Sequence, residues 1–291
     1  MSDQQVRLAY RRGKVGLRLE SGFLAIILWL VALVSFETHA ETIVLVHGYS
    51  GNSQQWRKDG VLPVLQRAGF SYQGDLHAKR NYVYLAPVPT VEQYGDVVYT
   101  VDLPDQLSIE LQSVMLGVYL QSIYEIRRES FVLVGFSAGG VVARAWLTSK
   151  YHLPTKALMT IATPHLGTPV AKYAERIRKT PLKMLMDVAT PYDLGRSKSI
   201  LQELSPAQKG SYLYWLNHLP HPDIFYYSII RREKSLLKKD FVVPLHSQNM
   251  NNVEGISGRS ASLLTVGDHS LTPADGMYIL QLLQIMKSEA G

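Results

Sequence analysis

Short apolar runs alternate with amphipathic stretches along most of this chain. The apolar runs are rich in β-branched residues, as buried strands are, and they lie at Thr42–Val46, Tyr82–Ala86, Val97–Leu103, Phe131–Val134, Ala157–Ala162, Ile224–Ile230 and Ser262–Val266. The stretches between them favour helices at Trp56–Gly69, from Pro104 to about Arg128, at Val141–Thr148 and from Pro273 to about Met286. This alternation predicts an α/β fold with a mostly parallel sheet and helices on both faces.

The longest helical pattern, which starts at Pro104, carries a stripe of apolar side chains. The stripe consists of Leu107, Leu111, Val114, Met115, Val118 and Ile123. Residues spaced by three and four positions share one side of a helix, so we expect this stripe to face the core.

The segment from about residue 169 to 222 interrupts the alternation. It has no strand pattern, and it is divided into short helical patterns by Pro181, Pro191, Gly195, Pro206 and Gly210. We therefore expect a helical cap insertion within a single domain at 41–291. The cap is also a candidate lid over the site described below.

Residues 1–40 have the pattern of a secretory leader. The basic residues Arg7, Arg11, Arg12, Lys14 and Arg18 precede an apolar core at Phe23–Phe36, and Thr38-His39-Ala40 resembles a small-x-small cleavage site. The core is shorter than the ~20 residues that span a membrane, although the whole leader exceeds the usual length of about 15–30 residues. We expect an exported protein, periplasmic or secreted. The alternative is an uncleaved N-terminal segment that anchors the protein in the membrane.

The composition of the chain excludes several classes of chemistry and of binding partner. The chain has 291 residues, a formal net charge of +6 and no cysteine, so disulfides, thiolate catalysis and cysteine-ligated zinc are excluded. It has no basic tail and no nucleic-acid-binding signature, so we expect no nucleic-acid partner. A mildly basic surface is better suited to contact with anionic lipid. The sequence contains no acidic cluster suited to calcium, and we expect no metal and no cofactor.

The segment Gly135-Phe136-Ser137-Ala138-Gly139 follows an apolar run and precedes a helical pattern. A G-x-S-x-G sequence between a strand and a helix is typical of a nucleophile elbow, where a serine sits on a sharp, strained turn. Side chains at Gly135 and Gly139 would collide with the neighbouring helix and strand. Ser137 is therefore the candidate nucleophile.

A serine hydroxyl needs a base, and the base needs an orienting acid. In folds with this elbow the acid follows a late strand and the histidine follows the last strand. His269 comes just after Ser262–Val266 and before the terminal helix, so it is the predicted base. His246 is the reserve candidate, whereas His165 and His221 border the cap and are less well placed.

Asp240 is the predicted acid because it follows the strand at Ile224–Ile230 and precedes an apolar run. The alternative is that Asp240 is a solvated loop carboxylate beside Lys238 and Lys239. Three other aspartates are poorer candidates. Asp223 precedes the strand, Asp193 lies in the cap, and Asp268 is adjacent to His269, from which its side chain should point away.

A tetrahedral intermediate needs two backbone N–H donors. One is expected from Ala138, the residue after the nucleophile. The other is expected from Tyr49 in the loop His47-Gly48-Tyr49-Ser50-Gly51, where glycines allow a close backbone approach. His47 could be read as a base, but we expect it to hold this loop in place by hydrogen bonding.

These segments resemble the serine lipases of the α/β-hydrolase superfamily. Val44–Asn52 resembles the lipase oxyanion loop, and Gly135–Gly140 resembles the lipase elbow. Ile161–Pro169 resembles the T-P-H-x-G-[ST] stretch of bacterial triacylglycerol lipases and of lipase-like inositol deacylases. Asp240–Pro244 resembles the lipase D-G-x-V-P segment that carries the acid, except that Phe241 replaces the usual glycine. The resemblance covers about residues 42–170 and 224–286.

The resemblance implies ester hydrolysis through an acyl-enzyme. The expected substrate is an acyl ester with an apolar chain, such as a lipid, because aromatic residues gather near and beyond the cap. These residues are Tyr212, Tyr214, Trp215, Phe225, Tyr226 and Tyr227. For Phe225–Tyr227, which belong to a predicted strand, core packing is the better interpretation. Two alternatives remain for the whole protein: a thioesterase, amidase or acyltransferase with the same machinery, or an inactive, membrane-anchored binding protein.

Overall fold

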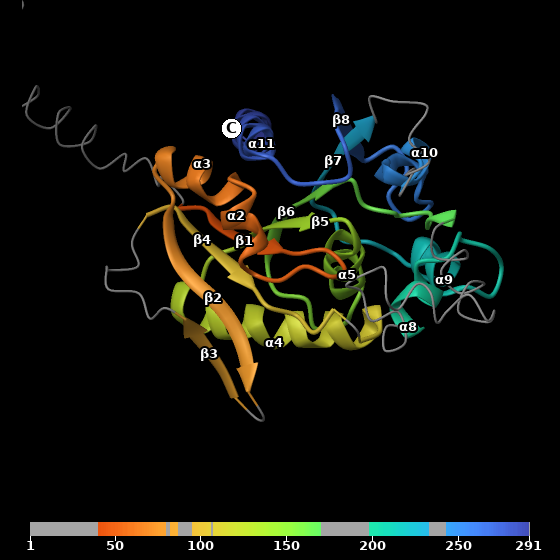
Figure 1. Cartoon of the computed structure of the whole chain (residues 1–291), viewed down its shortest axis with the longest axis horizontal. Coiled ribbons are helices and arrows are strands. Elements are labelled where there is room, and N and C mark those ends of the chain that lie inside the picture. Colours follow the sequence, from red (N-terminus) through yellow and green to blue (C-terminus); the bar gives the residue numbers. More distant parts are fainter. Residues whose placement is uncertain are drawn as a thin grey trace, which may run out of the picture. The chain divides into compact units, whose positions relative to one another are not determined.

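The computed structural model describes residues 40–79, 82–86, 95–105, 107–169, 198–232 and 243–290. One eight-stranded sheet organises them, in the order β3-β2-β4-β1-β5-β6-β7-β8 (Figure 1). The strands are β1 (Thr42–Val46), β2 (Ser71–Lys79), β3 (Tyr82–Ala86), β4 (Val97–Val101), β5 (Phe131–Phe136), β6 (Thr155–Ile161), β7 (Phe225–Arg232) and β8 (Ser260–Val266). The predicted α/β class, with a mostly parallel sheet, is confirmed.

All neighbouring strands are parallel except β2 and β3, which pair antiparallel at the edge of the sheet. Every strand predicted from an apolar run is present. Strand β2 was missed because its sequence, Ser-Tyr-Gln-Gly-Asp-Leu-His-Ala-Lys, is mostly polar. An edge hairpin with one partly solvated face lacks the continuous apolar run of a buried parallel strand.

Helices cover both faces of the sheet (Figure 1). On one face, α4 (Ile109–Arg127) and α5 (Ala138–Leu147) pack over the side chains of β1, β4 and β5. On the other face lie α3 (Val61–Arg67) and α11 (Pro273–Ala290). The central strands are therefore buried on both sides, which explains why their sequences are almost entirely apolar.

The predicted helix at Trp56–Gly69 is two helices. The first, α2 (Gln55–Lys58), ends at Asp59, and α3 begins after Gly60, whose φ is +81°. Glycine adopts this left-handed conformation without steric cost. The direction of the chain can therefore change at Gly60, which the apolar spacing alone did not reveal.

The expected core stripe of the longest helix was only partly right. Leu111, Val114 and Val118 are 52, 60 and 51% exposed. The buried side of α4 carries Ile109, Leu116, Tyr119, Leu120 and Ile123. Of the predicted stripe, Ile123 belongs to this side and Met115 packs against the core from a partly buried position. Both sides of this helix are rich in apolar residues, and packing onto the sheet selects the side with the larger, more continuous surface. The helix also starts later than predicted, after Ser108, whose hydroxyl accepts a hydrogen bond from the N–H of Leu111 at 3.2 Å.

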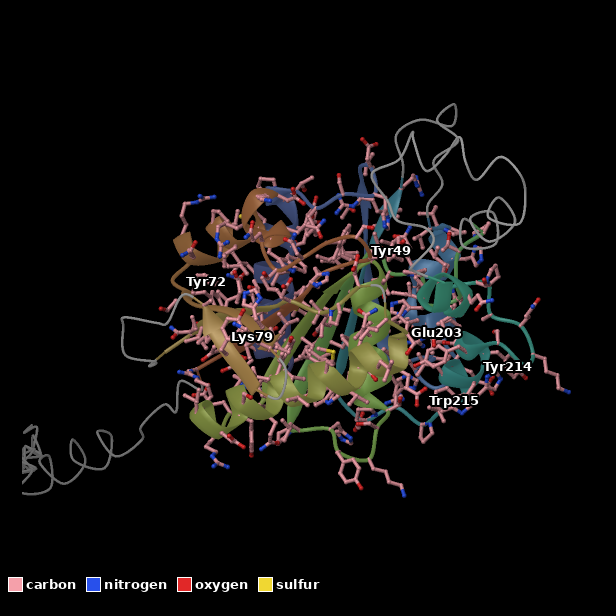
Figure 2. All side chains as sticks on the ribbon, turned by 60° about the horizontal axis from the view of Figure 1, so that its bottom comes forward. Tyr49, Tyr72, Lys79, Glu203, Tyr214 and Trp215 are labelled. Carbon is pink, nitrogen blue, oxygen red and sulfur yellow. The ribbon has the colours of Figure 1, made fainter. Side chains whose placement is uncertain are left out.

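The described part of the expected cap, residues 198–222, contains α8 (Lys198–Glu203) and α9 (Tyr212–His218). Glu203 of α8 accepts a hydrogen bond from the N–H of Ile109 at 2.6 Å, which joins this segment to the first turn of α4. Tyr214 and Trp215 lie exposed on α9 (Figure 2), whereas Tyr226 and Tyr227 are buried in β7 as predicted. Residues 170–197, which include Asp193, lie outside the described residues.

Candidate active site

The site lies at the carboxyl ends of β1 and β5, which are neighbours in the sheet. From β1 the chain continues to β2 on one side, and it later crosses from β4 over β1 to β5 and β6 on the other side, so the connections diverge here. In open α/β sheets, such a switch point leaves a crevice outside the carboxyl ends of the strands. Ser137 follows β5, and the loop from His47 to Gly51 follows β1.

Ser137 occupies a strained backbone conformation, with φ +51° and ψ −126°. Its N–H donates to the carbonyl of Ile161 at the end of β6 at 2.9 Å, and its own carbonyl accepts from Gly140 N–H at 3.1 Å. A non-glycine residue in such a conformation costs about 1–3 kcal/mol and persists only when its surroundings enforce it. Here β5, β6 and α5 enforce the turn that projects the serine.

Two glycines make the turn sterically feasible, as predicted. A Cβ atom at Gly135 would collide with the backbone of Gly140, and one at Gly139 would collide with the carbonyl oxygen of His47. Gly48 also approaches closely, since a Cβ placed there would lie 3.0 Å from the Cβ of Ser137. The strand β1, the serine turn and the helix α5 are thus in direct contact.

His269 lies beside Ser137. The serine Oγ is 2.9 Å from Nε2 of His269, and the imidazole stacks at a tilt on Phe136, with ring centroids 5.4 Å apart. His269 belongs to the loop between β8 and α11, the position predicted for the base. The distance is within hydrogen-bond reach for proton transfer between the two side chains.

The surroundings of His269 favour its neutral form. Burial and the nearby positive charge of Arg231 lower its pKa from 6.5 to about 4. Burial disfavours the charged imidazolium, and a like charge disfavours it further. Near neutral pH the imidazole is therefore unprotonated and able to accept a proton.

The loop after β1 is held by His47. Its Nδ1–H donates to the Gly48 carbonyl at 2.8 Å, and its Nε2 accepts from the N–H of Leu103 at 3.0 Å. The two bonds require a single neutral tautomer, because a carbonyl only accepts and a backbone N–H only donates. His47 thus ties the loop of Tyr49 to the segment after β4, and Ala138, at the first turn of α5, is buried beside the serine.

Sequence reasoning missed two aspartates that support the same loop. Asp102 accepts from Ser53 N–H at 3.2 Å and Asp105 accepts from Ser50 N–H at 2.8 Å. Asp102 follows β4 directly, and Asp105 lies in the same segment after β4. A signal was present, since polar residues just after a buried strand in an α/β sheet lie at the edge where sites form.

Asp240, the predicted acid, lies outside the described residues, which resume at Val243. Among the described residues, no carboxylate forms a hydrogen bond with His269. Asp223 is fully exposed and points toward Arg259, at 3.9 Å, and Asp268 is exposed on the loop of His269. The structure therefore brings Ser137 and His269 together without describing the third member.

The other histidine candidates have different surroundings. His165 and His221 are buried near Arg144, a fully buried arginine of α5 that donates to the His165 carbonyl at 3.4 Å. Burial and Arg144 lower the pKa of His165 well below 6.5 and that of His221 to about 3, and burial lowers the pKa of Arg144 to about 9. His246 is exposed on α10 (Leu245–Gln248).

Two further findings concern only the residues that the structure describes. None of their helices combines the length and apolarity needed to cross a bilayer. No group of three or more histidine or acidic side chains among them is arranged to hold a metal ion.

The sheet order and the strand–serine–helix turn give the chain the α/β-hydrolase fold. More particularly, residues 37–180 match the family model described as the PGAP1-like alpha/beta domain. This match includes β1, the serine turn and the Thr-Pro-His segment after β6, but it ends before β7 and β8.

Two solved structures share the fold. The mature form of the Bacillus licheniformis lipase BlEst2 has a TM-score of 0.58 at 16% identity, over 86% of this chain and 93% of that one. The product of gene lin2722 from Listeria innocua has a TM-score of 0.56 at 13% identity, over 81% and 88%. A comparison with curated protein sequences finds no match. The chain therefore has a lipase- and esterase-like hydrolase fold.

Proposed function

We propose that this protein is a serine carboxylic-ester hydrolase that acts on acyl esters through an acyl-enzyme. The supporting observation is the 2.9 Å approach of Ser137 Oγ to His269 Nε2 at a strained strand–helix turn. Nucleophile and base within hydrogen-bond reach are the minimum that covalent acyl transfer requires. The match to the PGAP1-like domain and the shared fold with a lipase agree with this chemistry.

In the acylation step, Ser137 Oγ attacks the acyl carbonyl carbon while His269 Nε2 takes the hydroxyl proton. The carbonyl oxygen becomes an oxyanion, which the backbone N–H groups of Tyr49 and Ala138 stabilise. The tetrahedral intermediate collapses, the bond to the leaving alcohol breaks, and His269 returns the proton to the alcohol oxygen. Asp240 orients the imidazole and stabilises its transient positive charge.

Deacylation repeats these roles with water as the nucleophile. His269 takes a proton from water, the hydroxide attacks the acyl carbon, and Ser137 leaves with the proton that His269 donates. The products are a carboxylic acid and the free enzyme. No metal or cofactor takes part in either step.

The substrate class is an acyl ester with an apolar chain, and a lipid ester at an anionic membrane surface suits the net positive charge of the chain. A thioesterase, amidase or acyltransferase would use the same residues. A panel of p-nitrophenyl esters of increasing chain length, with matched acyl thioesters and anilides, separates these activities. Hydrolysis of medium and long esters should exceed that of thioesters and anilides.

The serine mechanism is tested by labelling with a fluorophosphonate, which phosphonylates an activated serine with loss of fluoride. The wild type should label, whereas Ser137→Ala and His269→Ala should not. Labelling that survives Ser137→Ala would refute the proposal. A folded wild-type protein that never labels would instead favour an inactive binding protein.

We also propose that residues 1–40 direct export, with membrane anchoring as the alternative. The support is the sequence pattern of basic residues, apolar core and small-x-small site. Cell fractionation followed by N-terminal sequencing distinguishes the outcomes. A chain that begins near Glu41 outside the cytoplasm indicates cleavage, the full chain in the membrane fraction indicates an anchor, and full-length cytosolic protein rejects both.

A further inference from the structure

A buried ion pair lies beneath the loop that carries His269. Arg231, near the end of β7, and Asp275, in the first turn of α11, join through Nη2 and Oδ1 at 2.5 Å. The side chains are 5% and 0% exposed. Removing both charges from water is costly, so burial of the pair is by itself weak evidence that the pair stabilises the fold.

The pair lies close to the start of the loop and forms hydrogen bonds at its end. At the start, Gly267 N–H donates to the Arg232 carbonyl at 3.0 Å, and a Cβ atom at Gly267 would lie 3.0 Å from Arg231 Nη1. At the end, Asp275 Oδ2 accepts from the N–H of Thr272 at 2.7 Å and from its hydroxyl at 3.1 Å. Arg231 thus lies close beneath the first residue of the His269 loop, and Asp275 binds Thr272 at the end of it.

Two hydrogen bonds to Gln248 also hold the backbone of Arg231 in β7. Arg231 N–H donates to Gln248 Oε1 at 2.6 Å, and Gln248 Nε2 donates to the Arg231 carbonyl at 3.1 Å. Arg231 therefore has a rigid backbone from which its guanidinium extends toward α11.

The charged and polar groups around His269 come from four elements. Strand β7 supplies Arg231, α11 supplies Asp275, the loop itself supplies the exposed Asp268, and the turn after β5 supplies the neutral Ser137. Burial and then Arg231 are the causes that lower the pKa of His269. The negative charge of Asp275 partly offsets the positive charge of Arg231. Its carboxylate oxygens bind the guanidinium and Thr272.

We propose that the Arg231–Asp275 pair is a positioning device that holds His269 against Ser137. This inference rests on the proposed function, because it assigns His269 the role of base. The pair touches no reacting atom. Arg231 and Asp275 act through the position and the charge state of His269.

The test uses full-length protein and two kinds of variant: one removes both charges of the pair, and the other leaves the charge of Arg231 without its partner. Arg231→Met/Asp275→Leu replaces the ion pair by apolar side chains of similar size, a type of exchange that often preserves the fold. Asp275→Asn keeps an acceptor for Thr272 but leaves Arg231 without its counter-charge. Arg127→Met is the matched control, since Arg127 is also a buried arginine paired with a carboxylate, Glu129 at 2.7 Å, but it lies at the amino end of β5.

Two measurements are made across pH. The imidazole signal of His269, assigned by its loss in His269→Gln, is titrated by NMR. The rate of fluorophosphonate labelling, plotted against pH, gives the pKa below which the enzyme loses its reactivity. The double variant should move both titrations up by about one pH unit, and Asp275→Asn should move both down by up to about one unit. Arg127→Met should move neither.

The outcomes separate this inference from the proposed function. If the variants fold and label but their titrations coincide with the wild type, the inference is wrong and the serine mechanism stands. If the NMR titration shifts as expected but neither the variants nor the wild type is labelled, then Arg231 and Asp275 do control the charge state of His269, and the catalytic role of His269 is wrong. Equal loss of labelling in both variants, without opposite shifts, would indicate a structural role alone and overturn the inference.

Discussion

Ser137 Oγ lies 2.9 Å from His269 Nε2, although 132 positions separate the two residues in the chain. The first residue follows β5, and the second follows β8, at the far side of the parallel sheet. Parallel strands end at one edge, so loops that are distant in sequence meet there.

The acid is predicted to be Asp240. Asp240→Asn should lower kcat by roughly 10⁴-fold, because an amide would hold the imidazole in the wrong tautomer and leave its positive charge unbalanced. Asp268→Asn, beside the histidine, is the control and should change kcat by less than about threefold. Steady-state kinetics with a p-nitrophenyl ester measures both. A larger loss in Asp268→Asn than in Asp240→Asn would reverse the assignment.

His47 is predicted to shape the oxyanion loop. His47→Gln removes a ring that bridges Gly48 and Leu103, so the N–H of Tyr49 should lose its alignment. We expect kcat to fall about 10²-fold while KM changes little, because the lost stabilisation acts on the transition state. His152→Gln, an exchange at an exposed histidine, is the matched control and should leave both constants unchanged. A loss confined to KM would argue against this role.

Stability is predicted to fall at mildly acidic pH. The pKa of His221 in the folded protein is about 3, below its ordinary value of 6.5, and that of His165 is also lowered. The unfolded chain therefore binds more protons below pH 6.5, and the stabilisation present above that pH is lost as the pH falls. Each such histidine contributes a slope of up to about 1.4 kcal/mol per pH unit.

Urea unfolding at pH 7, 6 and 5 measures this dependence. His221→Asn should flatten it, because Asn does not titrate, whereas the exposed His152→Asn should not. If the free energy of unfolding of the wild type is constant between pH 7 and 5, both buried histidines must titrate normally and the assignment of their surroundings is wrong.

The orientation of α4 gives a prediction about stability alone. Leu116→Ala should reduce the free energy of unfolding by about 2–4 kcal/mol, because Leu116 is fully buried against the sheet. Val118→Ala should change it by less than about 0.5 kcal/mol, because Val118 is 51% exposed. Denaturant titration of both variants checks which side of α4 faces the sheet. The reverse order of effects would restore the stripe first expected from the sequence.

Local sequence patterns predicted much of the fold. The central strands are buried on both faces, so their sequences are continuous apolar runs that can be recognised without any partner. The turn at Ser137 is likewise local, because Gly135 and Gly139 are needed wherever a strand, a serine and a helix meet this closely. The helix boundaries were less accurate, since Gly60 splits one predicted helix through its backbone conformation alone.

The candidate site was only partly accessible from sequence. His269 could be placed after the last strand, because chain order in this fold restricts the base to that position. Arg231 and Asp275 were missed. Two signals were present: a charged residue at the end of an apolar strand, and a Thr-x-x-Asp pattern at the start of α11, typical of a helix cap. Neither pattern indicates that the two residues meet.

By itself, therefore, the sequence determined the α/β class, the central strands and the serine turn, because each depends on side chains a few positions apart. Tertiary structure decided which apolar side of α4 is buried, how β2 pairs with β3, and which charge lies beneath His269. These outcomes depend on contacts between segments far apart in the chain. Such contacts produce no periodic pattern of apolar residues in the sequence. They form through packing and burial only once the sheet is in place.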